Sequence, residues 1–191
     1  MKKINKIILA TLLSISPLLA DDSKYEYNSS SLVGVEFAYN NFKVDYGETP
    51  VVEDSYNYSS GGLKIGAQTD NYRIFLSARN MQISEFDYAY TLGGEFQYLF
   101  DTSKYVDFYL GVNAGQAEIK FVDASGVTRT IADPYYGGDI GMNIHVTDGI
   151  DVELGARVMT LNAENDKEDV IYTFNSITSG YMSIIFKYQM D

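Results

Sequence analysis

The only histidine of the chain, His145, is the first residue to consider for chemistry, because an imidazole can act as a general base. Its neighbours supply no nucleophile: Thr147 lies two residues further on, inside a Thr-Asp-Gly turn, and no serine accompanies it. The chain contains no cysteine, which excludes a disulfide and a lipid-modified N-terminal cysteine. The sequence therefore predicts a hydrogen-bonded structural histidine, no enzymatic site, no metal and no cofactor.

Carboxylates that could act as an acid–base pair are the second candidate. Glu36, Glu95, Asp139 and Glu153 fall at alternate positions of segments that have Lys or Arg residues close by. Ion pairs are the simpler interpretation of carboxylates with neighbouring cations. We expect these side chains to form a structural charge network.

Two acidic stretches, residues 42–60 and 161–178, are candidates for cation binding or recognition. The second has four carboxylates against Lys167 but lacks the glycine and the ligand order of an EF-hand loop. The first mixes Tyr46, Tyr56 and Tyr58 with Ser, Asn and Gly, a composition that suits surface recognition. We expect solvated loops, with a weak divalent-cation site and adhesion through the first loop as alternatives.

The elements that must position these residues are β-strands, and the stretch from Tyr88 to Phe100 shows the pattern most clearly. Alternate residues from Tyr90 onward are apolar, aromatic or glycine, while the interleaved residues are mostly polar. A period of two places the two sets on opposite faces of a strand. The stretch is longer than a usual strand of about five or six residues and suits a tilted membrane-spanning strand of about 9–11.

The same alternation recurs along the rest of the chain. The eight predicted strands cover about residues 32–41, 61–69, 71–81, 88–100, 104–115, 135–146, 149–160 and 179–190. Their apolar faces carry no charged residue, whereas their polar faces carry six acids and five bases. These charged residues are Glu36, Glu95, Asp107, Asp139, Asp151, Glu153, Lys64, Arg73, Arg79, Arg157 and Lys187. An Arg or Lys that faces lipid near the bilayer centre costs roughly 2–4 kcal/mol, so the charged faces are expected to point inward.

The sequence thus predicts an all-β fold, an eight-stranded antiparallel up-and-down transmembrane β-barrel with an apolar exterior. Eight strands leave an interior just wide enough for side chains to fill, and the near balance of acids and bases predicts ion pairs there. A lipocalin-like soluble barrel, with its apolar face inside, is the alternative that alternation alone leaves open.

Connection lengths and aromatic residues predict an orientation. Short connections at about 70–71, 101–103 and 147–149 alternate with long ones at about 42–60, 82–88, 116–134 and 161–178. Short turns are periplasmic in outer-membrane barrels, and aromatic rings prefer both membrane interfaces. The predicted aromatic girdles are Tyr39, Tyr90 and Tyr136 near the long connections, and Tyr72, Tyr98, Phe100, Phe108 and Tyr188 near the short turns.

Residues 1–20 are typical of an export signal. Three lysines precede an apolar run at residues 7–15, and Ala20 ends a candidate cleavage region. An uncleaved anchor is the alternative, although the run is shorter than the roughly 20 residues of a membrane span. Residues 21–191 are expected to form a single barrel domain. Removal of the signal takes the net charge from −12 to −15, which argues against a nucleic-acid partner.

With this pattern, residues 31–190 resemble the small eight-stranded outer-membrane β-barrels of Gram-negative bacteria, such as the OmpA membrane domain, OmpX and Ail. Members of that family usually end in an aromatic residue that the barrel-assembly machinery reads, whereas this chain ends Gln-Met-Asp. The resemblance implies a monomer in the bacterial outer membrane. Its implied partners are outer-membrane lipid, lipopolysaccharide and, during insertion, the barrel-assembly machinery.

Enzymes of this membrane that modify lipid A combine a histidine with a serine on such a barrel. Here, His145 falls beside the short turn, whereas lipid A occupies the opposite leaflet, so catalysis is not expected. Two functions stay open. The favoured one is a non-enzymatic structural or surface-interaction role through long acidic extracellular loops, and the alternative is a small-solute pore.

Overall fold

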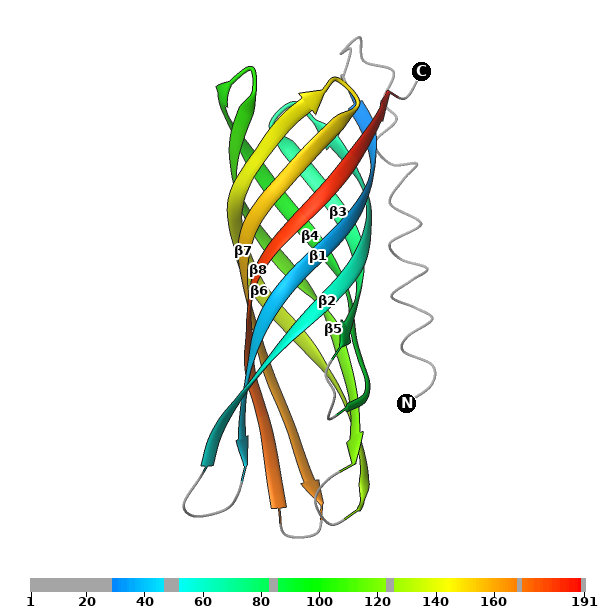
Figure 1. The fold of residues 1–191 in the computed structure, drawn as a ribbon, viewed down its shortest axis with the longest axis vertical. Coiled ribbons are helices and arrows are strands. Elements are labelled where there is room, and N and C mark those ends of the chain that lie inside the picture. The colour runs from blue at the N-terminus through cyan, green and yellow to red at the C-terminus, as the bar shows by residue number, and fades with distance from the viewer. Residues whose placement is uncertain (1–28, 47–51, 83–85, 123–125, 168–169, 190–191) are drawn as a thin grey trace, which may run out of the picture.

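The computed structural model describes residues 29–46, 52–82, 86–122, 126–167 and 170–189, so the predicted signal at 1–20 lies outside the described residues. It contains eight strands: β1 (Ser29–Tyr46), β2 (Val52–Thr69), β3 (Tyr72–Gln82), β4 (Phe86–Ser103), β5 (Val106–Val122), β6 (Thr128–Thr147), β7 (Ile150–Lys167) and β8 (Val170–Gln189). Consecutive strands pair antiparallel, and β8 pairs with β1 to close the ring (Figure 1). The predicted eight-stranded up-and-down barrel is confirmed. Within the described ranges, no helix is long and apolar enough to span a membrane.

The predicted long loops are wrong, because most of their residues belong to strands. β1 continues to Tyr46 and β2 begins at Val52, which leaves little of the expected loop at 42–60. The same holds at 82–88, at 116–134, where β5 reaches Val122, and at 161–178, where β7 and β8 are separated by residues 168–169 alone. In Figure 1 the β1–β2, β5–β6 and β7–β8 hairpins project together at the bottom, opposite the short turns.

The reason for this error is that the amphipathic pattern inverts within each long strand instead of ending. On β1, Glu36 points inward and Phe37 points outward, but further along the strand Phe42 is inside and Lys43 is exposed. A prediction that requires apolar residues on the outer face therefore ends each strand where the two faces exchange character. The residue period of two continues through the exchange.

The inversion divides the lumen into two sections. The charged section lies next to the short turns and is lined by buried polar residues such as Glu36, Lys64 and Arg73. The apolar section lies inside the projecting hairpins and is lined by buried residues such as Phe42 and Phe121. A single continuous wall therefore encloses a charged interior and a mainly apolar one, which also holds the buried Arg129 beside Phe121.

Two of the short connections lie where they were predicted. Residues 70–71 join β2 to β3, with Asp70 at a φ of 39°, a left-handed conformation that Asp tolerates in tight turns. The connection predicted at 101–103 lies slightly later, at 104–105, because β4 continues to Ser103. Residues 148–149 join β6 to β7.

Glycines on the inner wall make room for large lumen side chains. A Cβ atom on Gly155 would collide with the Tyr109 hydroxyl and would lie 2.7 Å from the Tyr181 ring. Those two tyrosine hydroxyls share a hydrogen bond of 2.6 Å across the lumen. A side chain at position 155 would therefore displace this tyrosine pair.

We expect Gly155→Val to destabilise the folded barrel by roughly 1–3 kcal/mol, the usual cost of overpacking a filled interior. Gly138→Val is the matched control, because position 138 is exposed on the outer wall and its Cβ would approach no atom closer than 3.4 Å. Urea titration of the barrel in vesicles, followed by the mobility difference between unheated and heated gel samples, measures both. Equal midpoints for the two variants would contradict this packing.

Candidate functional site

The centre of the charged section is a network of seven charged side chains from five strands, each at most 5% exposed. The network consists of Glu36 on β1, Lys64 on β2, Arg73 and Arg79 on β3, Glu95 on β4, and Glu153 and Arg157 on β7. All seven belong to the set predicted from the sequence. The structure brings them into direct contact across the barrel axis.

Glu36 accepts hydrogen bonds from three cations. The Arg157 guanidinium binds it in a bidentate manner, with Nη1 2.8 Å from Oε1 and Nη2 3.0 Å from Oε2. Lys64 Nζ lies 2.9 Å from Oε2, and Arg79 Nε lies 2.7 Å from Oε1. Charge-assisted bonds of this kind are about twice as strong as neutral ones. Glu36 thereby links β1 to β2, β3 and β7 through the lumen.

The other two glutamates extend the network along the barrel axis. Arg79 Nη2 donates to Glu95, and Lys64 Nζ lies 3.5 Å from the same carboxylate. Glu153 accepts from Lys64 Nζ at 2.8 Å and from Arg73 Nη2 at 2.6 Å. The Lys64 ammonium thus contacts all three glutamates.

Aromatic and amide side chains complete the network, and they were missed by the sequence analysis, which followed charges. The Arg157 guanidinium lies 4.2 Å from the centre of the Tyr181 ring, a cation–π geometry. Gln97 Oε1 accepts from Arg73 Nε at 2.9 Å. The signal for these residues was present, because both alternate with outward-facing apolar residues on β8 and β4.

Asp139 was predicted in the network but lies beside it. Its carboxylate accepts hydrogen bonds from Gln97 Nε2 and from Asn113 Nδ2, each at 3.1 Å. It forms no ion pair with any residue in the described part of the chain. Two amide donors therefore solvate this buried carboxylate in place of a cation.

Asp107 and Lys187 were also predicted in the network, and they lie in a group at its short-turn end, which Asn143 joins to the centre by hydrogen bonds to Arg73 at 3.2 Å and to Asp151 at 2.8 Å. His145 lies between two carboxylates there, with Nδ1 2.9 Å from Asp151 Oδ1 and Nε2 2.9 Å from Asp107 Oδ2. Lys187 Nζ lies 2.8 Å from Asp151 Oδ1. We call these four residues the mouth cluster. It ties β5, β6, β7 and β8 together where the barrel opens.

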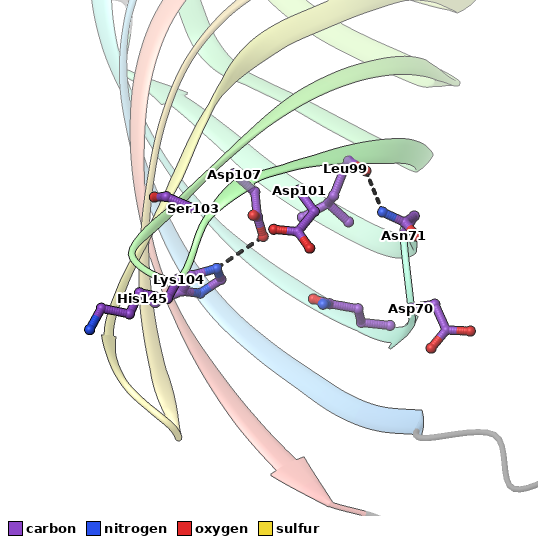
Figure 2. Close-up of a pocket in the computed structure, with 9 residues that line it drawn as sticks. Asp70, Asn71, Leu99, Asp101, Ser103, Lys104, Asp107 and His145 are labelled. Carbon is purple, nitrogen blue, oxygen red and sulfur yellow. Dashed lines mark hydrogen bonds and ion pairs between the residues drawn. The ribbon is translucent and has the colours of Figure 1, made fainter.

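A polar cavity of about 420 Å³ lies beside the mouth cluster (Figure 2). It is lined by Gln68, Asp70, Asn71, Leu99, Asp101, Ser103, Lys104, Asp107 and His145. Among the residues described, no group of three or more His, Asp or Glu is arranged to hold a metal ion. The cavity is a polar hollow at the short-turn end of the barrel.

Ser103 is a serine near His145 that the sequence analysis did not consider. Its hydroxyl accepts from the backbone N–H of Tyr105 at 3.3 Å and of Val106 at 3.1 Å, inside its own turn. Both His145 ring nitrogens contact carboxylates. A nucleophile requires a hydrogen bond to its general base, and Ser103 and His145 do not share one.

The apolar section fills the lumen inside the projecting hairpins. Aromatic rings from four strands pack there, with the Phe42 and Phe174 centroids 5.3 Å apart and the Phe86 and Phe121 centroids 5.6 Å apart. The buried cluster comprises Phe42, Val44, Tyr58, Met81, Ala89, Ala117, Ile119, Phe121, Ile131, Tyr135, Met159, Leu161, Phe174 and Ile177. This core was missed because apolar residues were assigned to the outer wall throughout.

The aromatic residues predicted as girdles lie on the outer wall. Tyr39 and Tyr136 are 63% and 61% exposed, and Tyr90 is 41% exposed on the same side of the barrel. Near the short turns, Tyr98 is half-buried, and its ring centroid lies 4.9 Å from that of Phe100. The other predicted girdle residues, Tyr72, Phe108 and Tyr188, are exposed there.

We expect Glu36→Gln to destabilise the barrel by roughly 3–5 kcal/mol, because it leaves buried cations without their anion. The matched control is Asp87→Asn, which breaks a half-exposed 3.2 Å pair with Lys120 and should cost about 0–1 kcal/mol. Urea midpoints of both variants in vesicles provide the comparison. A Glu36→Gln midpoint equal to that of the control would show that the network does not stabilise the barrel.

Comparison with known proteins supports the fold and not a specific family. No protein-family model matches the sequence, and no curated protein does. Neisserial surface protein A is similar in structure, with a TM-score of 0.60 and 18% identity over 84% of this chain and 97% of that one. The outer membrane protein OprG of Pseudomonas aeruginosa gives 0.60 and 9% identity, covering 87% and 98%.

The attachment invasion locus protein Ail of Yersinia pestis, in complex with the heparin analogue sucrose octasulfate, gives a TM-score of 0.51 and 12% identity, covering 84% and 99% of the two chains. These likenesses are to proteins of nearly the same extent as the barrel described here. The chain has the fold of the small eight-stranded outer-membrane β-barrels.

Proposed function

We propose that the protein is a non-enzymatic barrel of the bacterial outer membrane with a structural or surface-interaction role. Large apolar side chains on the outer wall support the membrane location, such as Leu63 at 63% and Val112 at 61% exposure. A soluble barrel would bury these side chains, whereas acyl chains solvate them. The fold shared with outer-membrane barrels points to the same location.

The observation that carries the structural role is the filled lumen. In the described part of the chain, the ion-paired network is followed along the axis by the apolar section. A pore needs a continuous path for water, and apolar constrictions exclude water from such a path. The filled lumen therefore favours a structural barrel over the small-solute pore.

We assign the surface-interaction role to the projecting hairpins, because most residues of the predicted loops belong to strands. The hairpins around the apolar section carry polar residues on their outer face, including exposed Lys43, Asn57 and Thr130. We propose that this face and the acidic stretches at 42–60 and 161–178 meet the external medium. Ail was solved with a sulfated sugar, but the net charge of −12 of the present chain does not suit a polyanionic ligand.

The proposed membrane location extends to the export, the assembly and the lipid contacts of the protein. Residues 1–20 act as the export signal, and the barrel-assembly machinery inserts residues 21–191 as a monomer. The mature barrel contacts outer-membrane lipid and lipopolysaccharide, with the short turns in the periplasm. We expect the protein to bind no nucleic acid and no cofactor.

The structural role predicts no stable conductance steps when the refolded protein is added to a planar lipid bilayer, because the apolar section blocks the axis. Each preparation is first tested for a mobility difference between unheated and heated gel samples, which demonstrates a folded barrel. Reproducible conductance steps from such a preparation would establish the pore instead.

The non-enzymatic role predicts that lipid A from cells expressing the protein keeps its mass. His145 is held by carboxylates at the end of the barrel that faces away from lipid A, so His145→Ala should give the same spectrum. Mass spectrometry of extracted lipid A makes the comparison. A mass change that disappears in His145→Ala would identify an enzyme.

A further inference from the structure

A groove of about 510 Å³ crosses the outer wall over β1 to β4. Its floor consists of small residues on neighbouring strands, Gly61 and Ala78. A Cβ atom on Gly61 would meet no atom within 4 Å, so open space lies directly above this glycine. The groove is therefore a hollow in the wall and not a gap between strands, which remain paired here.

Large apolar side chains border this floor. Phe37 pairs in register with Gly61, and Ala78 pairs with both Leu63 and Leu92. The side chains of Phe37, Leu63 and Leu92 are 55%, 63% and 57% exposed. A molecule lying on the floor would thus contact apolar groups beneath it and on both sides.

One end of the groove carries hydrogen-bonding groups. Tyr90 lines the groove, and its hydroxyl donates to a Glu118 carboxylate oxygen at 2.7 Å. Tyr88 donates to the other oxygen of Glu118 at 2.8 Å, and the exposed Asn80 lies on the same side. Because Tyr90 belongs to the girdle near the projecting hairpins, this polar end faces the outer leaflet of the proposed membrane.

We propose that this groove is a binding site for one acyl chain of an outer-leaflet membrane lipid, whose polar head lies beside Tyr90 and Glu118. The proposal rests on the proposed membrane location. A chain in the groove contacts protein atoms on three sides, whereas a chain on the flat wall contacts them on one side and neighbouring acyl chains on the others. Water is a poor occupant, because an apolar hollow offers it too few polar partners. The amphipathic shape of the site matches a lipid.

Native mass spectrometry tests this binding directly. The barrel is refolded in vesicles of phosphatidylethanolamine and lipid A and transferred to detergent, and the bound lipid is counted and identified by mass. The wild type and the control Gly138→Leu should each retain one lipid, and Gly61→Leu, which fills the groove, should retain at least tenfold less. A wild type without a lipid adduct, an adduct of detergent alone, or equal retention by Gly61→Leu would overturn the proposal.

The site can also be located by fluorescence, because the chain has no tryptophan. Phe37→Trp places a fluorophore on the groove wall, and Ile140→Trp places one at a similarly exposed position on β6. Both are refolded in vesicles of a branched-chain phosphatidylcholine that contain a small fraction of phosphatidylethanolamine with brominated straight chains. Quenching should be several-fold greater for Phe37→Trp, and equal quenching would overturn the groove assignment.

The two levels of inference fail differently. Equal quenching in barrels that still show heat-dependent gel mobility would overturn the groove and leave the membrane barrel intact. A wild-type protein that stays monodisperse in detergent-free buffer would overturn the membrane location, and the lipid site with it.

Discussion

The structure depends on the cost of placing an ionised side chain against hydrocarbon. Every strand of the charged section turns its charged residues toward the barrel axis. A register shift of one residue would move all of them to the lipid-facing side. Inside, most of these charges are stabilised by short contacts between cations and carboxylates, as at Glu36 and Lys64, while amide donors stabilise Asp139. The outer wall and the lumen network are therefore two results of a single constraint.

The packing of small residues follows from this constraint. Eight strands enclose a narrow interior, and several long Arg and Tyr side chains fit there against wall positions that lack a Cβ atom. Gly155 provides this space for the tyrosine pair, and Gly62 provides it for Arg79, whose Cγ would lie 2.9 Å from an added Cβ. On the outer wall, Gly61 has the opposite effect and leaves a hollow. Neighbouring glycines on β2 thus serve different sides of the wall.

The sequence was sufficient for the strand number, the pairing order and the inward charged residues of the charged section, but it missed Arg129, which is 1% exposed among the apolar residues of the projecting hairpins. Alternation assigns residues to the two faces of a strand, and the cost of a charge in lipid identifies which face points into the barrel. Asp107 and Lys187 face inward as predicted, and they lie at the mouth because Asp107 is the second residue of β5 and Lys187 is two residues before the end of β8. The prediction is wrong beyond residues such as Asn40, because the outer face of a strand is apolar along only part of its length. Phe42 and Ile119 continue the alternation on the inner face, so the inversion was present in the residues themselves.

The exchange of polarity along the strands also fixes how deeply the barrel sits. Outward residues on the short-turn side of the girdle of Tyr39, Tyr90 and Tyr136, such as Ile74 and Leu76, are stable in hydrocarbon. Outward residues on the other side, such as Gln82 and Lys43, are stable in water. A shift of the barrel along its axis by two residues would place amides and an ammonium group in hydrocarbon, or would expose apolar side chains to water. The distribution of polarity on the outer wall thus sets the depth of the barrel in the bilayer.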